Sequence, residues 1–309
     1  MRNWGVAVRF RSVILRGTAI AWLASVCVWC RAEQAGEARQ SSHPAATPDT
    51  NAQYAQGASR FEAGDYGGAV RTLEPLRGDP TCAEGVLYML EESYRRTHKG
   101  ADARQAFIEL SSRYPDSALL HKLMGMAYDE QGDFQNAVRE FEAALQKDPN
   151  LTEVRFGIGL AYLKLHEEGN AEKWMRAEVD RNTCHAMALY YLGNIEQTSG
   201  RLPAAQEHYA NAVECSPKYV DAHIGLGTVL EAQGRDKDAL AAFRRAVESD
   251  PQNSAARYRL GRALAKVGQV RAAQEEFAKA RELKDAADAR AAANLGNTKK
   301  HPEGQDPIR

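Results

Sequence analysis

The sequence contains 309 residues, which is enough for one large domain or two modest ones. Charged residues make up 26% of the chain, but the formal net charge is only −1, which gives no electrostatic reason to expect a nucleic-acid partner, since such partners favour a concentrated basic face. Aromatic residues are only 8% and alanine is frequent, a composition that favours helices in close contact.

The first 32 residues have the pattern of a secretory signal peptide. They contain five arginines and no acidic residue, and residues 17–30 carry no charge. As a helix this uncharged run would be roughly 21 Å long, shorter than the ~30 Å hydrocarbon core of a bilayer. Together with the small residue Ala32, the pattern predicts cleavage near Ala32 and export to the periplasm or outside the cell.

Three alternatives to a cleaved signal peptide stay open. Residues 17–30 could remain as a membrane anchor, which is the only membrane contact expected, or the segment could be an arginine-rich mitochondrial presequence. A lipoprotein anchor at Cys27 or Cys30 is disfavoured, because Val26 and Trp29 stand where such a motif needs a small residue.

Residues 33–49 and 297–309 are polar stretches that contain prolines. Neither stretch can bury much apolar surface, so the first is predicted to be a flexible linker and the second a disordered tail.

Between these ends the sequence repeats with a period of 34 residues and no insertion. Position 20 of each unit is alanine in all cases, and position 8 is glycine in six of seven units, with Glu91 as the exception. Position 24 is always large and apolar. The predicted units are 50–83, 84–117, 118–151, 152–185, 186–219, 220–253 and 254–283.

Each unit has the pattern of two amphipathic helices. Positions 4, 7, 8 and 11 share one helical face, as do positions 20, 24 and 27. Small residues at positions 8 and 20 let two backbones approach, and the large residue at position 24 fills the space beside them. Glycine at position 15 suits a left-handed turn, and His98 and His166 are expected to adopt the same turn where they replace it. Proline at position 32 ends the second helix.

This pattern resembles the tetratricopeptide repeat (TPR) family over residues 50–283. The resemblance implies an all-α solenoid in which helix–turn–helix units stack into a right-handed superhelix, since one unit alone cannot bury its apolar face. Residues 284–296 are expected to form a helix that caps the last unit. The fourth unit departs most from the pattern, with Glu178 at position 27, and a loose or re-registered second helix is expected there.

Two cysteines lie at neighbouring ends of the fifth unit. Cys184 precedes its first helix and Cys215 ends its second. Because the two helices are antiparallel, an exported protein could join this pair in a disulfide. The alternative is a pair of small buried thiols, and Cys82 has no evident partner.

The TPR resemblance also implies a concave groove, which positions 2, 5, 9 and 12 of the first helices face. Position 5 is aromatic in five units. Spaced aromatic side chains with polar donors suit an extended or helical peptide, because they supply contact area at little entropic cost. The alternative is that aromatic residues are simply common at this position. The candidate partner-binding residues are Tyr54, Tyr88, Lys122, Phe156, Tyr190, Asn194, Tyr258 and Arg262.

The predicted function is that of a non-enzymatic scaffold that binds a protein or peptide in the periplasm or cell envelope. The alternatives are a self-associating structural envelope protein and an accessory subunit of an envelope enzyme complex. An enzyme is not expected, because no stretch outside the repeats is long enough to form a catalytic domain. No catalytic residue, cofactor or metal site is predicted, since the histidines and cysteines lack the spacing of metal ligands.

Overall fold

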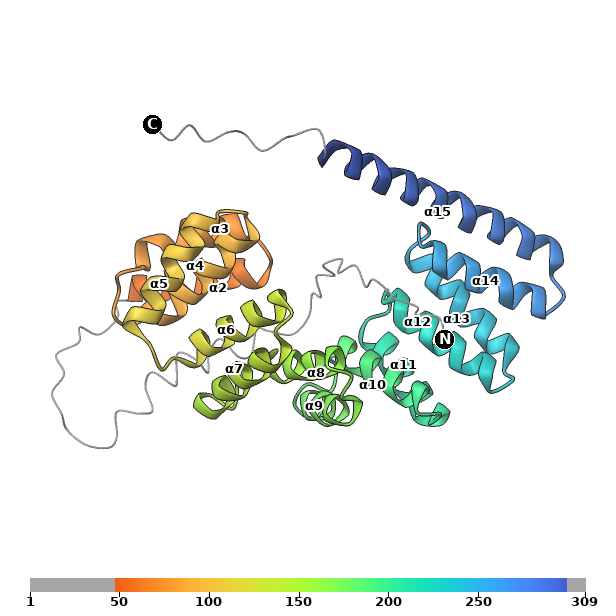
Figure 1. Cartoon of the computed structure of the whole chain (residues 1–309), viewed down its shortest axis with the longest axis horizontal. Helices are drawn as coiled ribbons and strands as arrows, with labels where there is room; N and C mark the ends of the chain where they lie inside the picture. The colour runs from red at the N-terminus through yellow and green to blue at the C-terminus, as the bar shows by residue number, and fades with distance from the viewer. Residues whose placement is uncertain (1–47, 299–309) are drawn as a thin grey trace. The chain divides into compact units, whose positions relative to one another are not determined.

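The computed structural model describes residues 48–298, and there the chain consists of α-helices joined by short turns, without strands (Figure 1). The all-α solenoid predicted from the sequence is confirmed. The predicted signal peptide and nearly all of the predicted linker and tail lie outside the described residues. No helix within residues 48–298 is both long enough and apolar enough to span a bilayer.

Within residues 48–298 the helices form seven consecutive pairs, one for each predicted unit. The first members of the pairs are α2 (Pro48–Glu62), α4 (Ala83–Arg96), α6 (Ala118–Gln131), α8 (Val154–Lys164), α10 (Ala186–Thr198), α12 (Val220–Ala232) and α14 (Ser254–Lys266). The second members are α3 (Tyr66–Leu73), extended by the 3₁₀ turn η2 (Glu74–Leu76), α5 (Gly100–Arg113), α7 (Phe134–Lys147), α9 (Glu168–Arg181), α11 (Leu202–Cys215), α13 (Asp236–Ser249) and α15 (Val270–Thr298).

The chain divides after Val154 into two compact units. In the N-terminal unit, α2 packs on α3, α4 on α5 and α6 on α7, and α3 also packs on α4. In the C-terminal unit, α11 packs closely on α12 and α13 on α14, so the next pair covers each of these second helices. The repeat pattern does not predict this division, because it continues across Val154 without an insertion.

Glycine at position 8 allows the two helices of a pair to approach. A Cβ atom added to Gly125 would lie 2.5 Å from the Phe141 ring, and one added to Gly227 would lie 2.6 Å from the Phe243 ring. The same conflict occurs in four other pairs: Gly57 with Leu73, Gly159 with Met175, Gly193 with Tyr209, and Gly261 with Phe277. The predicted complement between positions 8 and 24 is therefore a close contact in six of the seven described pairs.

The turns fall where the sequence predicts them. The five glycines at position 15 have φ between 74° and 81°, and His98 and His166 have φ of 60° and 62°. Both histidines are therefore turn residues that replace glycine in the left-handed region. The helices α5, α7, α11 and α13 each end two residues before a proline.

The second helix of the fourth unit was expected to be loose, and this expectation is wrong. α9 is a regular 14-residue helix in which Ala171 and Met175 are fully buried and Glu178 is also buried. Ala171 and Met175 lie one turn apart and keep the buried stripe in register, so one polar residue in the third turn does not displace the helix.

The C-terminal helix also differs from the prediction. Residues 284–296 continue the helix α15, which has 29 residues against 13 in its partner α14, but they do not provide the expected cap. Residues 284–290 are exposed, so these residues do not shield the last pair. The half that packs on α14 contains Ala273 and Phe277. The alanine-rich sequence prolongs the helix past the end of its partner because alanine has the best helix propensity.

Candidate partner-binding surface

In the N-terminal unit, the predicted aromatic residues at position 5 pack against neighbouring first helices. The hydroxyl of Tyr54 on α2 lies so close to Gly85 on α4 that an added Cβ atom would be 2.6 Å from it. Tyr88 on α4 contacts the edge of the Phe61 ring, with centroids 6.2 Å apart. The Lys122 ammonium on α6 lies 5.4 Å from the Tyr88 centroid, in cation–π range. The structure thus brings the candidates Tyr88 and Lys122 together.

Phe156 was predicted to face a partner, and the structure contradicts this. Its exposed fraction is 6%, because the His185 ring packs on it at a centroid distance of 4.7 Å and the Tyr191 ring at 6.0 Å. His185 precedes α10 and Tyr191 lies within it, so the next pair closes over Phe156. This side chain belongs to the core.

Tyr190 lies at the centre of an aromatic cluster and is half-buried. The rings of Tyr191, Tyr209 and Tyr219 surround it at centroid distances of 5.3, 5.9 and 5.2 Å. Burial raises the pKa of Tyr190 above its usual value, and a hydrogen bond with Asn194 partly opposes this rise. The Tyr209 hydroxyl donates to Asn194 Oδ1 at 2.6 Å. Tyr190 and Asn194 are therefore held by intramolecular contacts.

Tyr258 and Arg262 differ from the other candidates because both are open to solvent. Tyr258 is 53% exposed, although one side of its ring packs on Phe277 at a centroid distance of 5.6 Å. The Arg262 side chain is 47% exposed, and its Nη2 lies 3.7 Å from Glu231 Oε1 on α12. The two residues lie one turn apart on the same face of α14. No further first helix follows α14 within the described residues, which leaves the Tyr258 ring uncovered.

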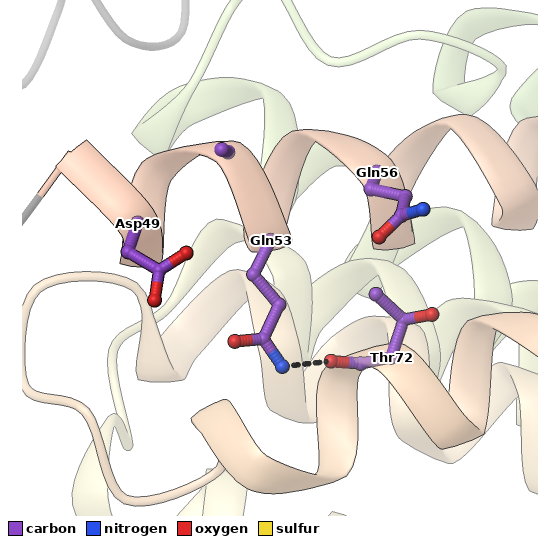
Figure 2. A pocket seen from close by; sticks show the side chains of 5 residues that line it. Asp49, Gln53, Gln56 and Thr72 are labelled. Atoms are coloured by element: carbon purple, nitrogen blue, oxygen red, sulfur yellow. Dashed lines mark hydrogen bonds between the residues drawn. The ribbon is translucent and has the colours of Figure 1, made fainter.

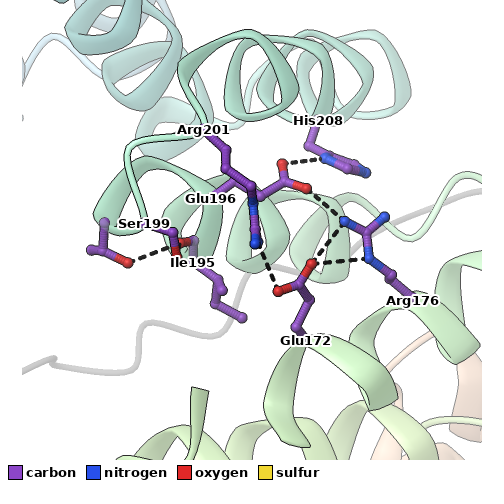
Figure 3. A network of polar contacts seen from close by, with 8 residues as sticks. Glu172, Arg176, Ile195, Glu196, Ser199, Arg201 and His208 are labelled. Carbon is purple, nitrogen blue, oxygen red and sulfur yellow. Dashed lines mark hydrogen bonds and ion pairs between the residues drawn. The ribbon is translucent and has the colours of Figure 1, made fainter. Parts of the chain in front are cut away.

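Sequence reasoning missed a buried ionic network in the C-terminal unit (Figure 3). Glu196 on α10 is 0% exposed, and it accepts a hydrogen bond from Arg176 on α9 at 2.7 Å while its other oxygen lies 2.6 Å from His208 Nδ1 on α11. Partial burial opposes the charge of Glu172, but hydrogen bonds from Arg176 and Arg201 hold its pKa below the usual value. Glu196 stands at position 11, on the apolar face of the repeat, and this departure was the available signal.

The network connects three successive helices through polar contacts of the Glu196 carboxylate with Arg176 and His208. A buried carboxylate without such partners would be costly, so its partners fix how α9, α10 and α11 meet. These polar groups are held by contacts with one another and contact no residue of α12 or α14 in the network.

A hollow of about 570 Å³ lies beside α2 and α3 (Figure 2). It is lined by Asp49, Ala52, Gln53, Gln56 and Thr72, and Gln53 Nε2 donates to the Thr72 carbonyl at 2.9 Å. These side chains contain no nucleophile with an adjacent base. Nor do the described residues contain a group of three or more His, Cys, Asp or Glu able to hold a metal ion.

Cys184 and Cys215 form a disulfide in the structure, with Cα atoms 5.3 Å apart. This distance satisfies the geometric condition for the predicted pairing, which fails above ~7 Å. The bridge ties the turn before α10 to the end of α11, beside Tyr190 and Tyr219. Cys82 is a thiol in the structure.

Comparison with known proteins identifies the repeats. Three family models described as "Tetratricopeptide repeat" match residues 118–151, 190–254 and 237–295. A crystal structure of MamA is 26% identical, with a TM-score of 0.50, and the match covers 54% of this chain and 97% of that one.

Two curated human proteins match shorter parts of the chain. Superkiller complex protein 3 from Homo sapiens is 30% identical over 105 residues, which is 34% of this chain and 7% of that protein. Protein O-mannosyl-transferase TMTC2 from Homo sapiens is 28% identical over 131 residues, which is 38% of this chain and 16% of that protein. The chain thus spans only a small part of these relatives. The repeat matches and the stacked helical pairs together show that the chain belongs to the tetratricopeptide repeat family.

Proposed function

We propose that this protein is a non-enzymatic scaffold that binds a peptide segment of a protein partner on the surface formed by α12 and α14. Repeats of this family support a protein or peptide as the class of partner. The observation that carries the location is the joint exposure of Tyr258 and Arg262 on one face of α14.

The chemistry of this face suits a segment with an apolar side chain followed by an acidic one. Tyrosine and arginine are among the residue types enriched in interface side chains that dominate binding energy. The Tyr258 ring supplies a rigid apolar surface with a polar tip. The Arg262 contact with Glu231 is long at 3.7 Å and the Arg262 side chain is half-exposed, so the contact contributes little and a partner's carboxylate can replace it.

The proposal also includes that the protein is not an enzyme and that it acts in the periplasm or cell envelope. Tetratricopeptide repeats fill most of the described residues, which supports a scaffold. The match with Protein O-mannosyl-transferase TMTC2 covers only 16% of that protein, so the transferase activity in its name gives no support for an enzyme here. The Cys184–Cys215 disulfide supports an oxidising compartment such as the periplasm, because such bonds persist there. Residues 1–32 also support export, because they have the basic start and short apolar run of a signal peptide.

The test is a capture experiment with matched single variants. Residues 33–309 are immobilised and exposed to an envelope extract of the source cell, beside Tyr258→Ala, Arg262→Ala and the control Val270→Ala. Val270 is also exposed, but it begins α15 and lies outside the proposed face. We expect wild type and Val270→Ala to retain the same partner. Tyr258→Ala should weaken binding of that partner, with a Kd at least about tenfold higher.

Equal binding by all four proteins would refute the proposed location. A mass that rises with concentration in light scattering, without a captured partner, would favour the self-associating alternative. Tyr190→Ala is unsuitable for this test, because its contacts with Tyr209 and Tyr219 make it a packing residue.

A further inference from the structure

In the C-terminal unit, three tyrosine rings gather where α10 and α12 meet. Both helices pack on α11 and also contact each other. Tyr190 and Tyr191 belong to α10, and Tyr219 is the residue before α12. The Tyr190 centroid lies 5.3 Å from that of Tyr191 and 5.2 Å from that of Tyr219. These three residues are only partly buried, whereas Tyr209 on their inner side is fully buried. We call Tyr190, Tyr191 and Tyr219 the tyrosine patch.

A carboxylate without a cationic partner belongs to the same place. Asp221 is exposed in the first turn of α12, two residues after Tyr219. It forms no salt bridge and no side-chain hydrogen bond within the part of the chain that the structure describes. Glu231, the other acidic residue of α12, has Arg262 and Lys266 within 4.0 Å. The helix therefore pairs one of its two carboxylates and leaves the other open.

The charge of Asp221 acts on all three rings of the tyrosine patch. Burial raises the pKa of the Tyr190, Tyr191 and Tyr219 hydroxyls, and the Asp221 carboxylate adds to the rise in each case. Partial burial also raises the pKa of Asp221 itself above its usual value, with no cation acting against this rise. The place thus combines neutral rings with a carboxylate whose charge the protein leaves unbalanced.

The turn that carries Tyr219 is fixed by its neighbours. The Cys184–Cys215 disulfide joins the chain before α10 to the end of α11, four residues before Tyr219. His223 on α12 places its Nε2 atom 3.0 Å from the Pro217 carbonyl oxygen. Since these contacts exist without a ligand, the rings lose little conformational freedom when a ligand binds.

We propose that Asp221 and the tyrosine patch bind the side chain of an arginine or lysine in a peptide segment of a protein partner. The face of a tyrosine ring is electrically negative and attracts a cation, and the carboxylate supplies the balancing charge. Arginine suits the site well because its planar guanidinium stacks on aromatic rings and matches the geometry of a carboxylate. This inference rests on the proposed function for the class of occupant, a peptide of a protein partner.

The charge preference of this site is opposite to that of the Tyr258 face. There Arg262 favours a carboxylate of the partner, whereas here Asp221 favours a cation. A segment that engages both places would therefore carry charges of both signs. Because the two places depend on different side chains, separate variants test them.

The test is a titration of residues 33–309 with two tripeptides, followed by NMR of isotope-labelled tyrosine rings. One probe is acetylated and amidated alanine–arginine–alanine, and the other has citrulline, the neutral analogue, in place of arginine. Asp221→Asn removes the charge of the site and keeps the shape of the side chain. An acidic residue in the first turn also stabilises a helix through its dipole. The matched control is therefore Glu168→Gln, which removes an exposed carboxylate from the first turn of α9 in the same unit.

We expect the arginine peptide to shift the ring signals of Tyr190 and Tyr219, with the same Kd in wild type and Glu168→Gln. Asp221→Asn should raise this Kd about tenfold, because it removes the charge from one hydrogen-bonded pair. The citrulline peptide should bind wild type about tenfold more weakly than the arginine peptide for the same reason. Tyr258→Ala should bind the arginine peptide as wild type does.

The inference is overturned if the two peptides bind wild type equally, or if neither shifts the Tyr190 and Tyr219 signals. This comparison uses wild type alone, so it holds even if a variant does not fold. A folded Asp221→Asn protein with the Kd of Glu168→Gln would also overturn it. Loss of the arginine peptide in Tyr258→Ala would assign the binding to the α14 face instead. Failure of the proposed function has a different sign, namely equal capture of the partner by wild type and Tyr258→Ala.

Discussion

Replacing Gly193 with alanine tests the contact that assembles each helical pair. The added Cβ atom would lie 2.7 Å from the Tyr209 ring, closer than real Cβ atoms approach. The ring cannot retreat, because a Cβ atom on Gly225 of α12 would lie 2.5 Å from its other side. Its hydroxyl is also fixed by contacts with Asn194 at 2.6 Å and Gln197 at 2.9 Å.

The cost of Gly193→Ala follows from two opposing effects. Overpacking a filled core costs about 1–3 kcal/mol, and the immobile ring places this site near the upper end. The higher helix propensity of alanine returns about 1 kcal/mol. We therefore expect the C-terminal unit to lose about 2 kcal/mol of its free energy of unfolding.

Tryptophan fluorescence during urea unfolding measures this change. Residues 33–309 contain a single tryptophan, Trp174 on α9, so the signal reports on the C-terminal unit. The matched control is Gly169→Ala on α9, the helix of Trp174, where nothing lies within 4 Å of an added Cβ atom. This control should be neutral or stabilising by up to about 1 kcal/mol.

A double-mutant cycle separates steric conflict from other effects. In a Tyr209→Leu background the ring is absent, so Gly193→Ala should cost at least about 1 kcal/mol less than in wild type. If Gly193→Ala is as harmless as Gly169→Ala, or if its cost is unchanged in the Tyr209→Leu background, the packing argument fails.

Three further predictions concern the C-terminal unit. Replacing Cys184 and Cys215 with serine should lower the unfolding free energy by about 3–4 kcal/mol, because the bridge closes a loop across 31 residues; equal urea midpoints with and without reductant would contradict this. Glu196→Ala should cost about 1–3 kcal/mol in the same assay, since it removes the buried carboxylate that both Arg176 and His208 contact, whereas an unchanged midpoint would mean that the network contributes nothing. Phe156→Ala should cost about 3–5 kcal/mol and Tyr258→Ala less than about 0.5 kcal/mol, and similar losses for both would refute the distinction between a core ring and a surface ring.

The sequence by itself determined the features that repeat with the period of 34 residues. The glycine at position 8, the large residue opposite it and the prolines after the second helices predict the helical pairs and their turns. These features are local, or they join helices only a few residues apart along the chain, so periodicity is enough to predict them. The positive φ of His98 and His166 is also predictable, because the turn at this position requires a residue that tolerates positive φ.

Only the tertiary structure decided which candidate residues remain open to a partner. Phe156 and Tyr258 occupy the same repeat position, yet the first is covered by the next pair and the second is not. The pairing of Glu196 with α9 and α11 likewise joins helices from two repeats. Exposure and pairing depend on what the neighbouring pair places above a residue, and the pattern within a single repeat carries no information about that.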